Sequence, residues 1–263
     1  MTHELFSEFK HILRDMSEAD LLAEIARPQK LLIASDHNVA RALDVAYAPF
    51  DHVNLNADIV IVGLTPGRQQ MRNALHEARR CLKAGVSDEA AKSAAKVFAS
   101  FSGPMRTNLI AMLDSVGVNR ALRLASTASL WGADANRVHF TSALRYPVFV
   151  ENENYSGAPS MLSTALLRKQ LMQWFATEMA ARPNAVFVPL GPKVTEAVEA
   201  VASHLGIGAT RILSGLPHPS GANGERIAFF LGRKKREDVS AKVDADRLLS
   251  CRVSLEAKIS SWR

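Results

Sequence analysis

The stretch Ile59-Val60-Ile61-Val62-Gly63-Leu64-Thr65-Pro66-Gly67 decides the fold, because a short run of apolar, β-branched residues stops abruptly at a glycine. Such a run is typical of a strand that is buried on both faces, as in a parallel sheet. In open α/β sheets, ligands bind just beyond the carboxyl ends of the strands. We therefore expect residues 63–67 to line a site, although an ordinary strand-to-helix turn would have the same sequence.

Three later segments, 138–143, 185–191 and 210–214, are also predicted strands, and helical patterns separate them. Strands that alternate with helices indicate an α/β fold, a three-layer α/β/α sandwich around a central, mostly parallel four-stranded sheet. The carboxyl ends of its strands should converge on one cleft. Residues 31–57 are less clear, and here Asp36 could cap a helix that runs through Ala48.

The chain is predicted to be a single domain over residues 1–263, with helical additions to the sheet. Helical spacing of apolar residues predicts an N-terminal helical extension over 1–57, in which Ser17 starts a second short helix. A basic helical insertion is predicted over 68–100. A C-terminal helix is predicted over 237–263, with its apolar residues facing inward: Val239, Val243, Leu248 and Leu249.

Composition limits the class of protein. Of the 263 residues 48% are hydrophobic and 22% are charged, which is typical of a globular chain. A formal charge of +6 favours a polyanionic partner such as DNA. The two cysteines, Cys81 and Cys251, are too few for a disulfide framework or a metal centre, so we expect no metal and no cofactor. Without a secretory or membrane-length apolar run, we expect a cytoplasmic protein with no membrane partner. We also expect a monomer.

A second stretch, His218-Pro219-Ser220-Gly221-Ala222-Asn223, gives the 63–67 segment a functional interpretation, because the two can be read together as a pair of motifs. The chain resembles the uracil-DNA glycosylase superfamily, whose first motif is a Gly-x-x-Pro turn and whose last motif begins His-Pro-Ser. Segments similar to those between the two motifs also occur in the family's order, at Phe101-Ser102-Gly103, 140–147 and 186–198. The resemblance covers residues 58 to 235.

The resemblance implies a DNA glycosylase, which flips a base out of DNA and hydrolyses its N-glycosidic bond, leaving an abasic site. His218 would then hydrogen-bond the leaving base as negative charge develops on it. Phe101 would stack on the flipped base, or it packs in the core. Leu64, Gly67 and Ser142 would form the walls around the base.

DNA contacts are implied for a second set of residues. Hydroxyl and glycine backbone groups would bind phosphates, at Ser220 and Gly221. Asn223 would read the opposite base, and Arg226 would fill the vacated stack, although an arginine in a glycine-rich loop is often only solvated. The basic run that includes Arg233 and Lys234 would contact the DNA backbone, or begin a solvated helix.

Departures from the family pattern bear on the target base. Thr65 stands where many members carry Asp, Asn or Glu, and its hydroxyl could at most orient the attacking water. Ser142 replaces a base-reading Asn, and Gly67 replaces the Tyr of strict uracil enzymes. These smaller residues favour a bulky target, such as the glucosylated hydroxymethylcytosine of phage DNA in a defence glycosylase. The alternatives are uracil or mismatch excision in base-excision repair, and an inactive member that binds DNA or protein.

A different α/β enzyme is disfavoured, because the chain has no Gly-x-Gly-x-x-Gly, Gly-Lys-Ser/Thr or Gly-x-Ser-x-Gly motif. The carboxylate that would activate water is not identified by spacing. Four candidates remain unranked: Asp36, Asp51, Glu77 and Asp114.

Overall fold

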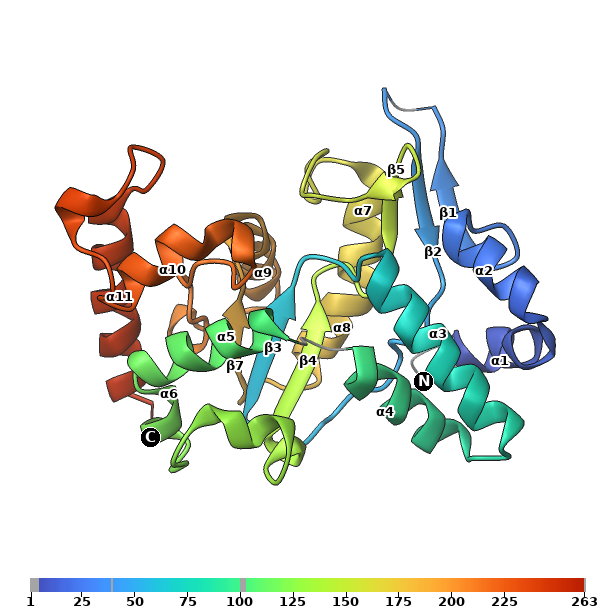
Figure 1. The fold of residues 1–263 in the computed structure, drawn as a ribbon, viewed down its shortest axis with the longest axis horizontal. Coiled ribbons are helices and arrows are strands. Elements are labelled where there is room, and N and C mark those ends of the chain that lie inside the picture. Colours follow the sequence, from blue (N-terminus) through green and yellow to red (C-terminus); the bar gives the residue numbers. More distant parts are fainter. Residues whose placement is uncertain (1–4, 39, 100–102, 263) are drawn as a thin grey trace. The chain divides into compact units, whose positions relative to one another are not determined.

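The structure, a computed structural model, describes residues 5–38, 40–99 and 103–262, whose elements are labelled in Figure 1. The chain divides into two compact units, each assembled from separate stretches of sequence. The first unit comprises Met1–Val53, Gly63–Ser100 and Phe140–Met179, and the second comprises Asn54–Val62, Phe101–His139 and Ala180–Arg263. That residues 1–263 form a single domain stays a prediction.

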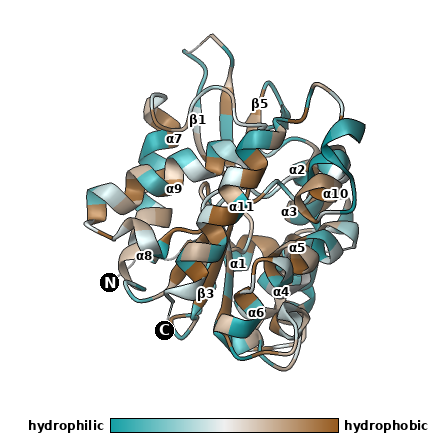
Figure 2. Ribbon diagram, turned by 90° about the vertical axis from the view of Figure 1, so that its left-hand side faces the viewer, coloured by the Kyte–Doolittle hydropathy of each residue, from teal (hydrophilic) through white to brown (hydrophobic). Residues whose placement is uncertain are grey.

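The apolar run 59–62 forms the central strand of a small sheet, as the sequence predicts. This strand, β3 (Ile59–Gly63), lies between β4 (Val138–Ser142) and β7 (Val186–Pro189), and it pairs with β7 in parallel. All five residues of β3 are buried, and the strand is hydrophobic along its length in Figure 2. Burial on both faces explains why its residues do not alternate between apolar and polar.

The prediction of a fourth strand at residues 210–214 is wrong. A 3-10 turn occupies Ala209–Arg211, and Ile212 then makes one isolated parallel bridge to Phe187 of β7. Gly215 follows closely in a left-handed conformation, with a φ of +114°. The turn before Ile212 and the glycine after it leave too few extended residues for a strand. Within the described residues the mixed α/β fold therefore has a three-stranded sheet in place of the four-stranded one.

A second, antiparallel sheet lies in the first unit, where the sequence did not predict one. Its strands follow the order β1-β2-β5-β6, with the bounds Leu32–Asp36, Leu43–Ala46, Val148–Val150 and Glu153–Asn154. The helix predicted from Asp36 through Ala48 is therefore wrong. The Asp36 carboxylate does accept a hydrogen bond from the Asn38 N–H, at 3.1 Å. This bond lies at the end of β1, where the chain turns toward β2, and both strands are blue in Figure 1.

Helices make up most of the rest of the first unit. They are α1 (Phe6–Asp15), α2 (Glu18–Ala26), α3 (Arg68–Lys83), α4 (Asp88–Ala99), α7 (Ala165–Gln170), a π-helical segment (Leu171–Ala176) and α8 (Thr177–Ala180). Ser17 caps α2 by accepting the Asp20 N–H, as predicted. The predicted insertion over 68–100 is helical, since it contains α3 and α4, whereas the 1–57 extension is helical only at its start.

The second unit contains α5 (Pro104–Ser115), α6 (Val118–Ala121), α9 (Pro192–Leu205), α10 (Gly224–Phe230) and α11 (Ala245–Ser260). The predicted C-terminal helix begins at Ala245 rather than near residue 237, because Asp244 caps it by accepting the Arg247 N–H at 3.0 Å. Val243 is buried, but Leu249 is 46% exposed, so the prediction that Leu249 faces inward is wrong. None of the described helices is long and apolar enough to cross a membrane.

Candidate functional site

The 63–67 turn and the end of β4 lie side by side in the first unit. The Ala143 N–H donates to the Gly63 carbonyl at 2.9 Å, and the Leu144 N–H donates to the Leu64 carbonyl at 3.0 Å. These bonds continue the ladder between β3 and β4 past the end of β3. Two predicted base-binding residues, Leu64 and Ser142, are thereby brought together, and both are half-buried.

The hydroxyl of Thr65 ties this turn to the segment that follows β4. Its Oγ1 donates to the Tyr146 carbonyl at 3.0 Å and accepts from the Val148 N–H at 3.2 Å. A threonine hydroxyl has one proton and two lone pairs, so one lone pair remains. Thr65 could therefore accept a hydrogen bond from a water molecule, but it could not also donate one. Its predicted role with the attacking water stays a prediction.

Gly67 begins α3 at the far end of the turn. Its N–H donates to Gln70 Oε1 at 3.0 Å, and the next N–H, that of Arg68, donates to Asn154 Oδ1 at 2.9 Å. A Cβ atom added to Gly67 would lie 3.7 Å from the Asn154 side chain, which is ordinary van der Waals contact. A small side chain would therefore fit at this position without moving its neighbours.

His218 is fixed in the second unit by a turn between two prolines. Its Nδ1 accepts a hydrogen bond from the Ser220 N–H at 3.3 Å, and the carbonyl of Pro219 accepts one from Asn108 Nδ2 of α5 at 2.9 Å. The ring lies against Gly191, just past β7, which has a φ of +92°, and a Cβ there would be 3.5 Å from the His218 Cβ. The predicted strand 210–214, which would have led to His218, is replaced by a 3-10 turn and a single bridge, and His218 lies instead beside the glycine that follows β7.

The protonation state of His218 follows from this geometry. Burial lowers the pKa of the imidazole below its ordinary value, so the ring is neutral at neutral pH. Because Nδ1 accepts the Ser220 N–H, the proton of the neutral ring is on Nε2. His218 therefore offers one N–H donor on the side of the ring that faces away from Ser220.

The predicted DNA-contacting side chains next to His218 bond to one another. Asn223 Nδ2 donates to Ser220 Oγ at 3.2 Å, and Arg226 Nη1 donates to Asn223 Oδ1 at 3.1 Å. Arg226 also donates through Nη2 to the Lys242 carbonyl at 2.8 Å. Gly221 is exposed, with open space where a Cβ would lie. In this arrangement Arg226 braces the 218–223 turn, and it would have to leave these partners to enter a DNA stack.

The two basic residues further along differ in their surroundings. Lys234 forms an ion pair with Glu225 at 2.6 Å, and Ser240 donates to the same carboxylate through its hydroxyl and its N–H. The hydrogen bonds from Lys234 and Ser240 lower the pKa of Glu225 to about 2. Arg233 is exposed. Of the two, Lys234 already neutralises a carboxylate, so Arg233 is the better placed to meet a phosphate.

The predicted site residues thus form two groups. The first unit holds Leu64, Thr65, Gly67 and Ser142, and the second unit holds His218, Ser220, Gly221, Asn223, Arg226, Arg233 and Lys234. Phe101, the predicted stacking residue, lies outside the described residues. That both groups line one cleft stays a prediction.

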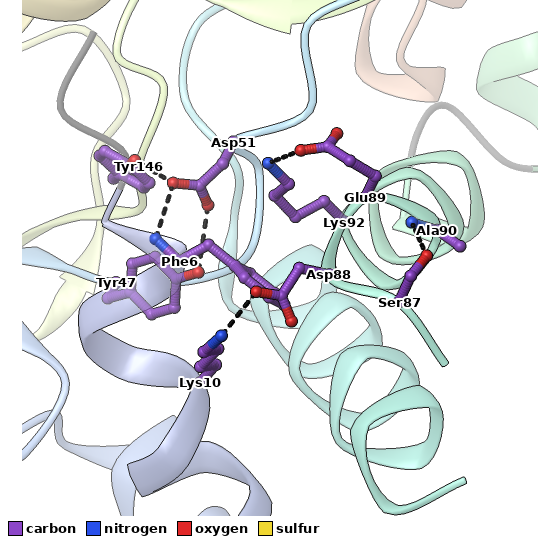
Figure 3. A network of polar contacts seen from close by, with 10 residues as sticks. All are labelled: Phe6, Lys10, Tyr47, Asp51, Ser87, Asp88, Glu89, Ala90, Lys92 and Tyr146. Atoms are coloured by element: carbon purple, nitrogen blue, oxygen red, sulfur yellow. Dashed lines mark hydrogen bonds and ion pairs between the residues drawn. The ribbon is translucent and has the colours of Figure 1, made fainter. Parts of the chain in front are cut away.

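The structure distinguishes the four carboxylates that the sequence left unranked. Asp51 is only 2% exposed, and three donors surround it: the Phe6 N–H at 3.2 Å, the Tyr47 hydroxyl at 3.1 Å and the Tyr146 hydroxyl at 2.9 Å (Figure 3). Burial raises the pKa of Asp51, and the hydrogen bonds from Tyr146 and Tyr47 oppose that rise. Its oxygens all point at the protein's own groups, so Asp51 organises the core of the first unit.

The other three carboxylates have local partners. Asp36 accepts the Asn38 N–H, Glu77 pairs with Arg80 at 2.6 Å, and Asp114 accepts from Ser126 Oγ at 2.7 Å and the Thr127 N–H at 2.8 Å. Among the described residues, no group of three or more His, Cys, Asp or Glu side chains gathers as a metal site would require.

A buried ion pair beside Asp51 was missed by the sequence analysis. Arg145 Nη2 lies 2.5 Å from Glu178 Oε1, both side chains are almost fully buried, and the guanidinium lies over the Trp174 ring. Tyr146 contacts the same ring edge-on, with 5.3 Å between centroids. The signal was the pair Arg145-Tyr146 directly after a predicted strand, but their partners are distant in sequence.

Comparison with known proteins gives a relative but no activity. Neither a family model nor a solved structure matches this chain. The chain is 33% identical over 235 residues to the Bacillus subtilis (strain 168) protein named "Uncharacterized protein YoxB", and the match covers 88% of each chain. Because the similarity extends over nearly the whole of both sequences, the chain belongs to the same protein family as YoxB.

Proposed function

We propose that this chain is a DNA glycosylase in which His218 donates a hydrogen bond to the leaving base. The observation that carries the proposal is the bond from the Ser220 N–H to Nδ1 of a neutral imidazole. It leaves His218 with one fixed donor, Nε2–H, in the motif that resembles the last motif of the uracil-DNA glycosylase superfamily.

The chemistry of base excision needs such a donor. Cleavage of the N-glycosidic bond leaves an oxocarbenium-like sugar and an anionic base, so negative charge grows on the base in the transition state. A preorganised donor aimed at that charge stabilises it without reorganisation, and removing one such donor typically costs about 100-fold to 1,000-fold in rate. A neutral imidazole suits the role because it keeps its Nε2–H and can donate this hydrogen bond without first gaining a proton.

The proposed target is a base with a bulky substituent, such as a glucosylated cytosine of phage DNA. Support comes from Gly67 and Ser142, two small residues at positions where the resembled uracil enzymes carry a Tyr and an Asn. A second candidate is a member that binds DNA without cleaving it. This second candidate is favoured because groups that base excision would use already bond within the protein. They are the hydroxyl proton of Thr65 and the Nη1 and Nη2 atoms of Arg226.

Replacement of His218 by alanine is expected to slow base release strongly. We would incubate the purified protein with DNAs carrying uracil, mismatches or modified cytosines and identify the released bases by mass spectrometry. The His218→Ala variant should release the base at least about 100-fold more slowly than the wild type. His204→Ala, in the exposed last turn of α9, is the matched control and should release it at the wild-type rate.

Three outcomes of that assay would contradict the proposal. Release of no base from any of the DNAs, with DNA binding intact, would favour the non-cleaving candidate. Equal rates for His218→Ala and the wild type would remove His218 from the chemistry. Release of uracil but not of bulky cytosines would contradict the proposed target.

Acid pH is expected to slow base release. Burial lowers the pKa of His218, so the neutral ring should persist from about pH 8 down to at least about pH 6.5. At lower pH the second proton enters at Nδ1, where it would face the Ser220 N–H, and the hydrogen bond that orients the ring is lost. Single-turnover rates should therefore be flat above about pH 6.5 and fall below it. A rate that rises on acidification would mean that the imidazolium acts as a general acid.

A further inference from the structure

The exposed side of α3 carries basic residues on four successive turns. Arg72, His76, Arg80 and Lys83 follow one another at intervals of three or four residues, which places them on one face of the helix. The opposite face is buried through Met71, Ala74, Leu75, Ala78 and Cys81. We call these four positions the basic face of α3; Arg72, Arg80 and Lys83 are exposed, and His76 is half-buried.

A hollow of about 360 Å³ opens on this face. It is lined by His76, Glu77, Arg79, Arg80 and Lys83, all from α3. One carboxylate, that of Glu77, is among them, and Arg80 holds it through two nitrogens at 2.9 and 2.6 Å. The Arg80 side chain is 65% exposed and the Glu77 side chain only 17%, so an approaching ligand meets the cation first.

Glu18 of α2 limits the positive charge at one margin. Its carboxylate lies 2.5 Å from Arg79 Nη1 and 3.6 Å from His76 Nδ1. Arg79 is also held by the Met16 carbonyl at 2.8 Å, so it serves chiefly to join α3 to the start of α2. Arg72 and Lys83, by contrast, are exposed, and they supply the charge that can meet a ligand, whereas the charge of the exposed Arg80 is balanced by Glu77.

We propose that the basic face of α3 binds the phosphate backbone of a DNA strand, as a contact additional to the base-excision residues. That the ligand is DNA rests on the proposed function. That it binds at this face rests on the complementarity between the basic side chains and the phosphates. Arginine and lysine on an exposed helix face attract phosphates without regard to sequence. The contact would hold the DNA by a segment, 68–83, that belongs to neither of the two motifs.

The salt dependence of DNA binding tests this proposal. We would measure binding of a labelled DNA duplex to the full chain between about 50 and 200 mM salt. The Arg72→Gln/Lys83→Gln variant should bind less tightly at low salt, and the slope of log K against log salt should become shallower by about 2, since each lost phosphate contact removes about 0.9. Glu18→Gln should act in the opposite direction and tighten binding.

The matched control removes two charges elsewhere in the same unit. Arg168 and Lys169 are exposed in α7, and Arg168→Gln/Lys169→Gln should leave the slope unchanged. Thermal midpoints would show that the variants fold. Equal slopes for the α3 and α7 variants, or absence of DNA binding by the wild type, would overturn the proposal. If the slope falls as expected while no base is released from any DNA, the proposed excision activity fails and the DNA contact stands.

Discussion

An Asp51→Ala variant is expected to lose about 4 kcal/mol of unfolding free energy, because its removal leaves three buried donors without an acceptor. The hydroxyls of Tyr47 and Tyr146 and the Phe6 N–H all point at this carboxylate. Both tyrosines are essentially inaccessible to solvent, so water would replace the lost acceptor only at a cost. The loss would be measured by urea unfolding at constant m-value.

Two control variants test whether the loss of unfolding free energy comes from the buried hydrogen bonds of Asp51 or from the removal of a carboxylate in general. Asp114→Ala removes a carboxylate that also accepts two bonds but is only half-buried, so its loss should be about 1 to 2 kcal/mol. Asp51→Asn keeps an oxygen acceptor and should cost less than Asp51→Ala. A loss for Asp51→Ala no larger than that for Asp114→Ala would contradict the prediction.

The ionisation of Asp51 adds a pH dependence with a definite sign. Burial raises the pKa of this carboxyl in the folded chain above its unfolded value of about 3.9. Between these two pKa values the folded state binds more protons than the unfolded state, so stability falls as pH rises. Relative to Asp51→Asn, the wild type should therefore gain stability as the pH is lowered through the raised pKa.

The position of Asp51 also explains why the sequence could not single it out. Its partner Tyr146 lies 95 residues further along the chain, and no local pattern links them. The run 59–62, in contrast, is predicted correctly because four consecutive apolar, β-branched residues need no distant information to be recognised. Strand β1 is only partly buried and ends in Ser35 and Asp36, and β2 contains Asp44, so neither forms the apolar run that identifies β3.

The candidate site, too, could be predicted from the sequence only in part. The 218–223 turn and its histidine are visible in the sequence as a motif, and His218 does follow a turn beside the end of β7. The bonds that decide chemistry are not visible: the acceptor role of Nδ1, the two backbone partners of Thr65 and the contacts that hold Arg226 in place. Each depends on side-chain positions that spacing does not determine.

Gly215→Ala is expected to destabilise the chain by about 3 to 5 kcal/mol, through backbone strain and a steric clash. Gly215 has a φ of +114°, which side chains other than hydrogen rarely allow. A Cβ at this position would lie 2.7 Å from the Cβ and 3.0 Å from the Sγ of Cys251 in α11. The Cβ of Cys251 is attached directly to the backbone of α11, so it cannot avoid the clash by a change of rotamer, as the end of a long side chain could.

Gly232→Ala separates the strain from the clash. Gly232 also has a left-handed φ, +70°, but a Cβ there would meet nothing within 4 Å. Its replacement should cost about 1 to 2 kcal/mol, the strain alone. Gly215 lies three residues before His218, so a backbone movement that relieves the clash should also shift the 218–223 turn. We therefore expect Gly215→Ala to slow base release even at temperatures where the variant remains folded. Equal losses of unfolding free energy for the two glycine variants would mean that α11 yields to the added methyl group.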